Sequence, residues 1–554
     1  MTPHQAFRDA REQLFAAHGD PDRASASFRW PELEAFNWAT HWFDEFADGN
    51  QRPALRVLTD DRLETVTFAE LLDRSRRVAR YLRDAGVNRG DRILLMLTNV
   101  VPLWETMLAA IRLGAVVIPA TPQLTSADVD DRIDRGGARH IVTDPQGAAR
   151  ITRPERLQVK LVVGAAPGFV PFDDVRTAAA EITNAPTRPD EPLLLYFTSG
   201  TAAKPKLVLH THASYPIGHL STMYWLGLRE GDVHQNISSP GWAKHAWSCF
   251  FAPWNAGATV LVHETKFSAR QMVEVLRRER VNTLCAPPTV WRMVALETLG
   301  ERPAELRELA SAGEPLNPEV IDTVQQAWGI TIRDGYGQTE TTALVGNAPG
   351  LTVKPGSMGK PLPGYDVVLL DSDGRESDEG EVALRLTPRP LGLMQGYVDD
   401  PARTDRVMAS GFYRTGDEAR RDADGYVHFI GRGDDVFKSS DYRISPFEIE
   451  SALLEHEAVA EAAVVPSPDH LRLSVPKAFV VLKPGVEANA QTARSILEFC
   501  KKTLAPYKRV RRLEFAVLPK TVSGKIRRVE LRTREAERRA RDERGASEFW
   551  LDEV

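Results

Sequence analysis

The sequence Thr198-Ser199-Gly200-Thr201-Ala202-Ala203-Lys204-Pro205-Lys206 directly follows an apolar run at residues 193–197. Backbone N–H groups, hydroxyls and ammonium groups at the end of a buried strand suit the oxygens of a polyphosphate. The stretch lacks the Gly-Lys-Ser/Thr of a Walker A loop. Taken alone, it fits either a phosphate-binding loop or an ordinary polar turn.

A second stretch, Asp334-Gly335-Tyr336-Gly337-Gln338-Thr339-Glu340, follows a strand predicted at residues 330–333 and reads as a loop. A Tyr between glycines can lie flat on a nucleobase, and a Glu carboxylate is a hard oxygen ligand for Mg²⁺. The other interpretation is a buried Tyr in a Gly-rich turn. Further motifs complete the set: Tyr413-Arg414-Thr415-Gly416-Asp417, Gly431-Arg432-Gly433-Asp434-Asp435 with Ser439-Ser440-Asp441-Tyr442-Arg443-Ile444 close behind, and Pro519-Lys520-Thr521-Val522-Ser523-Gly524-Lys525.

The composition is that of a globular protein. Of the 554 residues, 42% are hydrophobic and 26% are charged, and the net charge is −6. Near-neutrality at this size argues against a dedicated nucleic-acid binder, and apolar runs such as residues 92–98 are far shorter than the roughly 20 residues of a membrane span. Residues 1–20 lack the apolar core of a signal peptide. Cys249, Cys285 and Cys500 are too scattered for a disulfide framework or a zinc cluster. Taken together, these features lead us to expect a cytoplasmic enzyme that contacts neither nucleic acid nor membrane.

The predicted elements alternate between strands and helices. A capping box at Thr67 and Glu70 begins a helix, and strand 92–97, helix 102–113 and strand 115–119 form a βαβ unit. The pattern continues with predicted helices at 270–280, 289–299 and 318–328 and predicted strands at 283–286 and 330–333.

The pattern of predicted elements changes at about residue 350 and again at about residue 434. Short β-like runs separated by Asp-Gly and Pro-Gly turns fill residues 350–430. After residue 434 the pattern predicts a compact α+β region with helices at 446–455 and 492–504 and strands at 462–465 and 478–482. The Arg- and Glu-rich run at 527–544 predicts a solvated helix rather than a nucleic-acid surface.

In this order and spacing, the motifs resemble those of the adenylate-forming superfamily, which comprises acyl- and aryl-CoA synthetases, peptide-synthetase adenylation domains and firefly luciferase. The resemblance covers residues 50–540, and the medium-chain acyl-CoA synthetase branch is the most similar. It implies an α/β fold with a large N-terminal domain (residues 1–433) of two α/β subdomains plus a small β-barrel-like part. A small, mobile α+β C-terminal domain (residues 434–554) would follow.

The resemblance implies three groups of nucleotide-binding residues. Those that close on the phosphates are Thr198, Ser199, Gly200, Thr201, Lys204 and Lys206. Those around the adenine, with Tyr336 stacked on the ring, are Gly313, Glu314, Pro315, Asp334, Gly335, Tyr336, Gly337 and Gln338. Those on the ribose side are Asp417 and Arg432, with Arg443 as a further nucleotide contact.

The resemblance also implies the catalytic residues Thr339, Glu340 and Lys525. Thr339 reaches the α-phosphate, Glu340 holds Mg²⁺, and Lys525 bridges the acyl carboxylate and the α-phosphate. The reaction uses ATP and Mg²⁺ to turn a carboxylic acid into an acyl-adenylate with release of pyrophosphate, and CoA is the expected co-substrate. Attack of one anion on another needs cations where negative charge gathers. We expect the small domain to rotate at the hinge, Asp434, before the thiol attacks.

Several residues depart from the family pattern. Ala203 and Leu207 stand where glycines are usual in the phosphate loop, and Ser445 replaces another usual glycine. The expected CoA path is Ser440, Asp441 and Tyr442, and Asp441 also replaces a glycine. The sequence therefore implies adenylation more firmly than thioester formation.

The expected acyl pocket consists of Trp242, Ala243, Lys244, His245, Trp247 and Gly335. Its aromatic rings favour a medium-chain or aromatic acid. Lys244 and His245 either meet a polar substituent or the carboxylate of the acid, or face solvent or a phosphate. His210 and His212 have the alternating spacing of a strand metal site, but no third ligand accompanies them.

Three functions compete on the sequence alone. The leading hypothesis is a stand-alone acyl- or aryl-CoA synthetase, either monomeric or homodimeric. The second is an adenylate-forming enzyme with another acceptor, such as a carrier-protein thiol or an amine, or with another oxyanion substrate such as nitrite. The third is a nucleotide-binding regulator, which the presence of Lys525, Glu340 and Asp417 disfavours.

Overall fold

The computed structural model describes residues 1–60, 62–184, 186–198, 205–264, 267–439, 442–469, 472–520 and 525–553, and of Arg443 it describes only the backbone. The chain divides into two compact units. The first comprises Met1–Val367 with Leu384–Tyr413, and the second comprises Val368–Ala383 with Arg414–Val554. The domain boundary expected after residue 433 stays a prediction.

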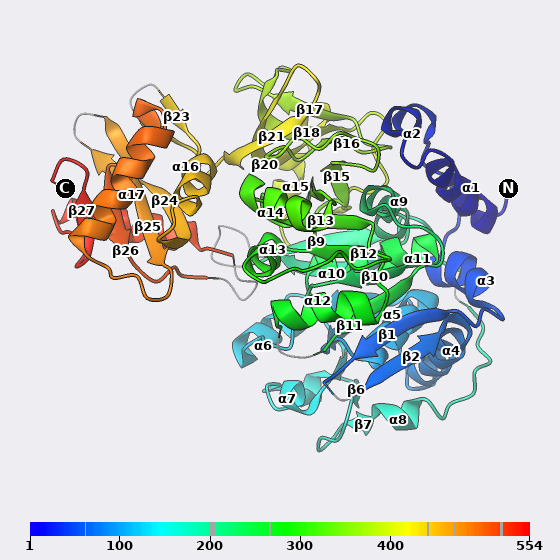
Figure 1. The fold of residues 1–554 in the computed structure, drawn as a ribbon. Coiled ribbons are helices and arrows are strands. Elements are labelled where there is room, and N and C mark those ends of the chain that lie inside the picture. The colour runs from blue at the N-terminus through cyan, green and yellow to red at the C-terminus, as the bar shows by residue number, and fades with distance from the viewer. Residues whose placement is uncertain are drawn as a thin grey trace. The chain divides into compact units, whose positions relative to one another are not determined.

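A nine-stranded sheet forms one half of the first unit (Figure 1). Neighbouring strands from β1 and β11 through β10, β12, β13 and β14 run parallel, as the alternation of strands and helices predicts. In spatial order the strands are β16 (Lys360–Pro361), β15 (Ala343–Gly346), β14 (Ile332–Gly337), β13 (Glu308–Ala312), β12 (Thr283–Ala286), β10 (Val233–Asn236), β11 (Thr259–His263), β1 (Pro53–Leu58) and β2 (Leu63–Thr67).

Helices α12 (Ala269–Arg278), α13 (Pro288–Ala295) and α14 (Pro318–Trp328) cover one face of this sheet. Leu284, Leu309 and Ile332 occupy register positions on the face that packs against them. Residues one position further along each strand therefore point to the opposite face. That opposite face carries Cys285, Ala310 and Arg333.

An eight-stranded sheet forms the other half of the first unit. Strands β3 and β4 are parallel and are joined by α5 (Val101–Leu113), which confirms the predicted βαβ unit. In spatial order the strands are β19 (Gly396–Tyr397), β9 (Lys206–Thr211), β8 (Pro192–Thr198), β4 (Val116–Pro119), β3 (Arg92–Met96), β5 (His140–Thr143), β6 (Val159–Val162) and β7 (Val170–Pro171). The predicted capping box at Thr67 and Glu70 is confirmed at the start of α4 (Phe68–Asp84).

A buried helical layer lies between the two sheets. Every residue of α9 (Ser214–Leu226) is buried, and α9 contacts β9 of one sheet and β13 and β15 of the other. It is accompanied by α10 (Ala243–Ala246), η3 (Trp247–Phe251) and α11 (Ala252–Ala256). Trp104 Nε1 donates to the carbonyl of Cys249 at 2.7 Å and so ties α5 to η3. This layer places the expected acyl-pocket segment inside the unit.

The first unit also contains helices outside these sheets and the helical layer. They are α1 (Pro3–Ala16), α2 (Pro21–Ser27), η1 (Ala39–Phe43), α3 (Asp44–Ala47), α6 (Ser126–Asp134), α7 (Pro145–Ala148), η2 (Pro154–Arg156), α8 (Phe172–Val175), α15 (Pro401–Val407) and η4 (Ala409–Gly411). Among the described residues, no helix combines the length and the apolar character that crossing a membrane requires.

The second unit contains the expected short β-strands and the expected α+β region. Most of a four-stranded sheet belongs to it: β17 (Val367–Leu370), β18 (Glu379–Arg385), β20 (Phe412–Arg421) and β21 (Val427–Arg432). The remaining elements are β22 (Phe437–Ser439), β23 (Tyr442–Ile444), α16 (Pro446–Leu454), β24 (Val459–Asp469), β25 (Leu473–Leu482), α17 (Ala490–Thr503), η5 (Pro506–Lys508), β26 (Arg512–Phe515), α18 (Arg528–Ala540) and β27 (Glu548–Trp550).

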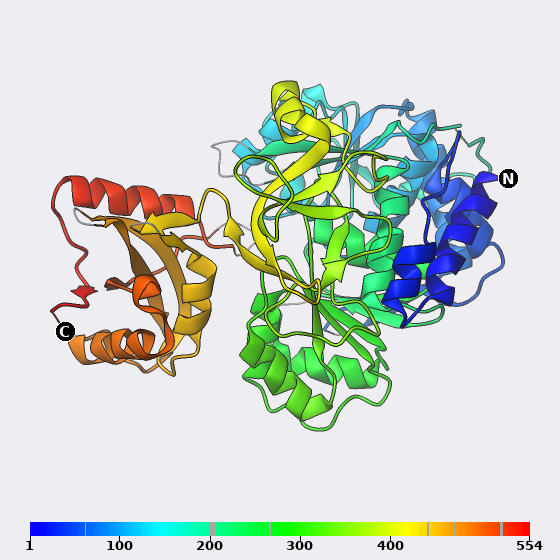
Figure 2. The ribbon, with the colours of Figure 1, turned by 90° about the horizontal axis from the view of Figure 1, so that it is seen from above.

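Alternation along β24 gives the second unit a core on each face of its sheet. Ala462 and Val464 pack with α16 and α17, whereas Ala463 and Val465 pack with Leu531 of α18. Figure 2 shows α17 and α18 on opposite sides of the strands. Because Leu531 and Glu535 are buried, the prediction of a fully solvated helix at 527–544 is wrong for this face of α18.

The loop predicted at residues 334–340 begins later than expected. Strand β14 continues through Gly337, because Gly335 and Tyr336 pair with Gly346 and Val345 of β15. Glycine is a poor strand residue, but here it leaves room for a neighbour: a Cβ at Gly335 would collide with the indole of Trp225.

Candidate active site

The predicted phosphate motif lies between two paired strands. Thr198 ends β8 and Lys206 begins β9, and the two residues are partners in the antiparallel register. The predicted site residues Ser199, Gly200, Thr201 and Lys204 lie outside the described residues. The two strands therefore fix where the motif leaves and re-enters the sheet.

Lys206, Glu340 and Tyr397 form a polar cluster beside this motif. Lys206 Nζ donates to Glu340 Oε1 at 2.5 Å, and the Tyr397 hydroxyl donates to the same oxygen at 2.9 Å. Burial alone would raise the pKa of Glu340, but the charge and hydrogen bond of Lys206, aided by Tyr397, hold that pKa below its ordinary value. Glu340 is therefore an ionised carboxylate although only 5% of it is exposed.

His210 holds the adjoining residue, Thr339. Its Nε2 lies 2.7 Å from the Thr339 carbonyl, and its Nδ1 lies 2.9 Å from Ser214 Oγ. Burial lowers the pKa of His210 to about 4, so the ring is neutral and donates one N–H to the carbonyl. The alternating His210 and His212 thus include a residue that anchors the Thr339 turn.

The expected adenine residues gather where β13 and β14 end side by side. Ala312 and Gly335 are register partners, so Gly313, Glu314 and Pro315 leave β13 beside Tyr336. Gly313 has a φ of +113°, a conformation that side chains disfavour, and nothing described lies within 4 Å of where its Cβ would be. This edge offers backbone and one half-buried aromatic ring.

Asp334 and Gln338 brace this edge from within. Burial raises the pKa of Asp334 to about 7, and its carboxyl group accepts N–H bonds from Leu316 at 3.3 Å and Gly335 at 3.0 Å. Gln338 Oε1 accepts a hydrogen bond of 2.9 Å from the Tyr413 hydroxyl. Asp334 therefore positions backbone rather than exposing a carboxylate.

Two of the predicted acyl-pocket residues line a small apolar cavity. Its volume is about 20 Å³, and its lining includes Trp242 and His245 together with Leu95, Met107 and Tyr196. His245 Nε2 lies 2.8 Å from Asn99 Oδ1, and burial lowers the His245 pKa to about 3. The hypothesis that His245 faces solvent is wrong, because the residue is only 6% exposed.

Trp247, Lys244 and Ala243 lie elsewhere on the same segment. Trp247 Nε1 donates to the Tyr215 hydroxyl at 2.8 Å, and a Cβ at Gly337 would lie 2.6 Å from the tip of the Trp247 indole. The Lys244 ammonium is buried, so solvent exposure of this group is also wrong, and Ala243 is half-buried. The Trp247 indole therefore packs against the end of β14. On the same strand, the indole of Trp225 packs against Gly335.

The expected ribose residues are neighbours within the second unit. Asp417 and Arg432 are partners in the antiparallel register of β20 and β21. Burial would lower the pKa of Arg432, but the charge of Asp417 and those of Asp434 and Asp435 outweigh burial and raise it. Arg432 Nε also donates to Asp434 Oδ1 at 3.3 Å.

The expected hinge residue, Asp434, is exposed and is held from α18. Its carbonyl accepts a hydrogen bond of 2.5 Å from Arg532 Nη1, and Arg532 also reaches Asp435 at 3.3 Å. These contacts tie the residue to the second unit, and a hinge at Asp434 stays a prediction.

The expected catalytic lysine and CoA path also belong to the second unit. Lys525 is exposed, next to a bridge between Lys520 and Ile526. Tyr442 is 54% exposed and stacks on Tyr507 with ring centroids 4.4 Å apart. Ser440, Asp441 and the Arg443 side chain lie outside the described residues.

Two stretches of the chain match a known protein family. Residues 43–398 match the family described as AMP-binding enzyme, and residues 448–525 match its C-terminal domain. The chain belongs to the AMP-binding enzyme family. With the mixed α/β architecture above, it consists of the large N-terminal and small C-terminal domains of adenylate-forming enzymes.

Relatives cover almost the entire sequence. A 4-hydroxybutyrate–CoA ligase of Metallosphaera sedula is 43% identical over 94% of both chains. The mitochondrial acyl-coenzyme A synthetase ACSM3 of Mus musculus is 42% identical over 96% of both chains. The crystal structure of the anthranilate CoA ligase AuaEII with anthranoyl-AMP matches with a TM-score of 0.84 and 28% identity, covering 92% of this chain and 99% of that one.

The two family matches border the segment that contains three of the expected site residues. The first ends one residue after Tyr397, the second ends at Lys525, and Asp417, Arg432 and Asp434 fall between them. Sequence reasoning missed Tyr397, His210 and Trp225 as site residues. The family motifs give no signal for them, because each acts through a partner distant in the sequence.

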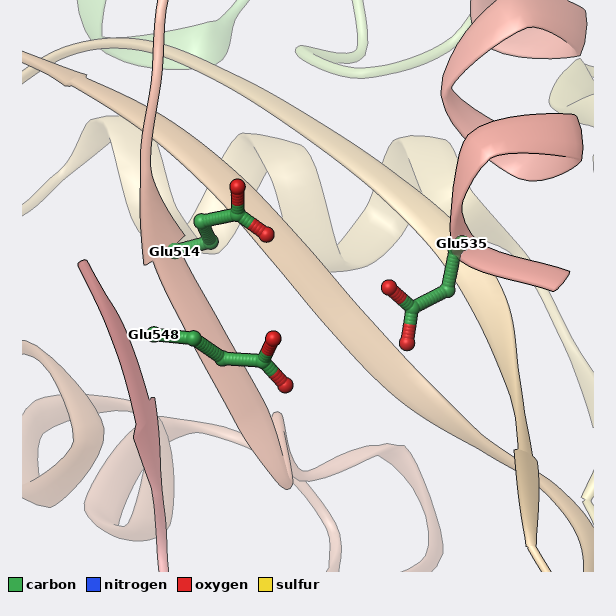
Figure 3. A group of neighbouring side chains, drawn as sticks. All are labelled: Glu514, Glu535 and Glu548. Atoms are coloured by element: carbon green, nitrogen blue, oxygen red, sulfur yellow. The ribbon is translucent and has the colours of Figure 1, made fainter. Parts of the chain in front are cut away.

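One group of acidic residues could be mistaken for a second metal site in this AMP-binding enzyme. Carboxylates of Glu514, Glu535 and Glu548 converge from β26, α18 and β27 (Figure 3). Lys477 Nζ already lies among them, at 2.7, 2.6 and 2.9 Å respectively. The ammonium takes the place that a cation would need, so this cluster is a structural ion network.

Proposed function

We propose that this enzyme is an acyl-CoA synthetase. It activates a carboxylic acid with ATP, releases pyrophosphate, and passes the acyl group of the acyl-adenylate to CoA. The cluster of Lys206, Glu340 and Tyr397 beside Thr339 carries this proposal. It puts a cation and an ionised carboxylate where the phosphate motif joins the sheet.

In this proposal the phosphate motif and Thr339 hold the triphosphate. Thr198 and Lys206 fix the two ends of the motif, and the Lys206 ammonium neutralises phosphate charge. His210 keeps the Thr339 turn in one conformation, so the hydroxyl needs little reorganisation to meet the α-phosphate.

We assign Mg²⁺ to Glu340. The carboxylate suits this hard cation, because Lys206 and Tyr397 both donate to Oε1 and keep the group ionised. When bound, the ion neutralises charge on the phosphate oxygens. Lys206 then stays close enough to share that charge.

We assign the binding of adenosine to residues near the ends of strands. Tyr336 stacks on the adenine between the Gly313–Pro315 and Gly335–Gln338 segments, which offer backbone groups to the base. Asp417 accepts the ribose hydroxyls, and the charge of Arg432 beside it keeps the carboxylate in place.

Formation of the acyl-adenylate needs a cation at the reacting carboxylate, and we assign this role to Lys525. Its ammonium bridges the acid and the α-phosphate while the oxyanion attacks in line and pyrophosphate leaves. A hinge at Asp434 then moves Lys525 away and admits the thiol along Ser440, Asp441 and Tyr442. The names of the three relatives described above, two CoA ligases and an acyl-coenzyme A synthetase, favour CoA as the acceptor.

We place the acid beside Trp247, where its indole packs against the end of β14. The indole limits the length or width of the acid, which favours medium-chain or aromatic acids. We further expect the reaction to take place in the cytoplasm.

A substrate panel tests the proposed function. Pyrophosphate release from ATP is measured with straight-chain acids from acetate to dodecanoate and with benzoate, each with and without CoA, and acyl-CoA is detected by mass spectrometry. Acid-dependent pyrophosphate release and a CoA-dependent thioester are expected. Pyrophosphate release without any thioester would mean that the acceptor is not CoA. No pyrophosphate release with any acid would refute acid activation.

A further inference from the structure

The described residues offer the buried Lys244 side chain the thiol of Cys285, but no nitrogen or oxygen acceptor. The Lys244 ammonium nitrogen is buried, and among the described residues no hydrogen bond to nitrogen or oxygen satisfies it. Burial lowers its pKa, and the groups that oppose burial are, in decreasing strength, Cys285, Cys249 and Asp334. Burying an uncompensated charge is costly, so its presence calls for an explanation.

The neighbouring thiols cannot balance this charge. Burial raises the pKa of Cys285 and raises that of Cys249 to about 12, so both are neutral at physiological pH. The Cys249 thiol already accepts a hydrogen bond of 3.1 Å from Asn236 Nδ2. The carboxyl group of Asp334 already accepts hydrogen bonds from the backbone N–H groups of Leu316 and Gly335.

The same face of the nine-stranded sheet carries two more unsatisfied polar atoms. Asn236, Cys285 and Arg333 share this face through the register of β10, β12, β13 and β14. Asn236 Oδ1 and Trp225 Nε1 are buried there without a hydrogen bond in the described chain, and Trp225 lies against Gly335, two residues beyond Arg333. Asn236 Oδ1 is an acceptor, whereas the Lys244 ammonium and the Trp225 indole N–H are donors, so two of these three atoms lack an acceptor.

Lys244 belongs to the side of its segment that faces this sheet. Lys244 and Trp247 are three residues apart, so they lie on one side of a helical stretch. Trp242 and His245 line the apolar cavity on the other side. Trp247 reaches Gly337, two residues before Thr339. An acid held at Thr339 would therefore extend past Trp247 toward Lys244.

We propose that Lys244 determines substrate specificity by binding an oxygen at the end of the acid remote from the activated carboxylate. The acid is thus an ω-hydroxy, ω-oxo or dicarboxylic acid rather than a plain hydrocarbon acid. This inference rests on the proposed acid activation and narrows its substrate class. Occupation by such an oxygen gives the ammonium the acceptor that the folded chain withholds.

Paired substrates test the proposal in the wild-type enzyme. Straight-chain acids from propionate to octanoate are each compared with their ω-hydroxy and dicarboxylic counterparts by acid-dependent pyrophosphate release. At the best chain length, an oxygen-bearing acid should exceed its hydrocarbon partner in kcat/KM by about tenfold or more. A dicarboxylate preference assigns an anion to Lys244, and a hydroxy-acid preference assigns a neutral acceptor.

Lys244→Met removes the ammonium and keeps most of the side-chain volume. It should lower kcat/KM for the preferred oxygen-bearing acid by about 10- to 100-fold, mainly through KM, while the hydrocarbon partner is unchanged or improved. A merely structural role would weaken both acids alike. Lys160→Met, at a half-buried lysine of β6 whose Nζ lies 3.5 Å from the Pro154 carbonyl, serves as the control.

Two results would overturn the inference while acid activation stands. One is hydrocarbon acids that match or exceed their oxygen-bearing partners at every chain length, which needs no variant. The other is an equal loss for both partners in Lys244→Met. Absence of activity with every acid would instead refute the proposed function, so the two failures are distinguishable.

Discussion

The ion network around Lys477 should hold the end of the chain onto the second unit. The side chains of Lys477, Glu535 and Glu548 are all 0% exposed, and the ammonium contacts three carboxylates within 2.9 Å. Arg539 joins Glu535 at 2.8 Å and Glu548 at 2.6 Å. The network therefore connects β25, β26, α18 and β27.

Replacing Lys477 with Met leaves three buried carboxylates with less positive charge. Removal of one partner from a buried ion pair typically costs about 3–5 kcal/mol, because the other charge stays buried. We expect β26 and β27 to open more easily by this amount, which is a rise in amide exchange of at least about a hundredfold.

Lys520→Met is the matched control in the same unit. Lys520 also pairs with a glutamate, Glu461, at 2.7 Å, but these side chains are 41% and 38% exposed. Such a surface pair contributes less than about 1 kcal/mol. Amide exchange should therefore change little in this variant.

Hydrogen–deuterium exchange of the full chain measures both variants. Peptides that cover β26 and β27 report on the network, and peptides from the nine-stranded sheet report on the first unit. Exchange in β26 and β27 that stays within about threefold of wild type in Lys477→Met would refute the reasoning. An equal rise in Lys520→Met would do so too.

Three further predictions concern the reaction and its pH range. Lys525→Ala should lower ATP–pyrophosphate exchange by about a hundredfold or more with an unchanged melting temperature, and exchange near the wild-type rate would exclude the assigned role. Asp441→Gly should speed thioester formation while pyrophosphate exchange stays level, because a carboxylate about 5 Å from a thiolate opposes it by roughly 3 kcal/mol at an effective dielectric near 20; equal rates of both half-reactions in the wild type would contradict this. Burial would raise the pKa of Glu548, but the Gly545 N–H and Lys477 lower it to about 2, so its stabilising contribution is present above the ordinary value of 4.5 and is lost as the pH falls toward 2. Acid unfolding monitored by circular dichroism in wild type and Glu548→Gln checks this, and identical pH profiles would refute it.

Local signals in the sequence were sufficient for most elements. The capping box at Thr67 and Glu70 begins α4 because both partners lie within one helical turn. Strand β8 follows from the apolar run at residues 193–197. These features depend on neighbours in the sequence, so the sequence alone identifies them.

Contacts between distant residues could not be predicted in this way. Tyr397 lies 57 residues from Glu340 and 191 from Lys206, yet it contacts both. The charge pattern of α18 suits a solvated helix, but Glu535 is buried, and one of its partners is Lys477, 58 residues earlier in the sequence. Strand β14 extends through Gly337 because β15 pairs with it, against the low strand propensity of glycine.

Two buried lysines of this enzyme differ in what folding provides for them. Lys477 has three carboxylates, so its charge stabilises the folded chain, whereas Lys244 has neutral thiols and no hydrogen bond to nitrogen or oxygen within the described residues. The same substitution should therefore have opposite effects. Lys477→Met lowers stability, but Lys244→Met removes an unpaid desolvation penalty and should leave the melting temperature of the first unit unchanged or higher, as often happens when a functional group is removed. Differential scanning calorimetry of the two variants decides the matter. A loss of stability in Lys244→Met as large as that in Lys477→Met would mean that the folded chain itself satisfies Lys244, and the ammonium would then not be available to a substrate.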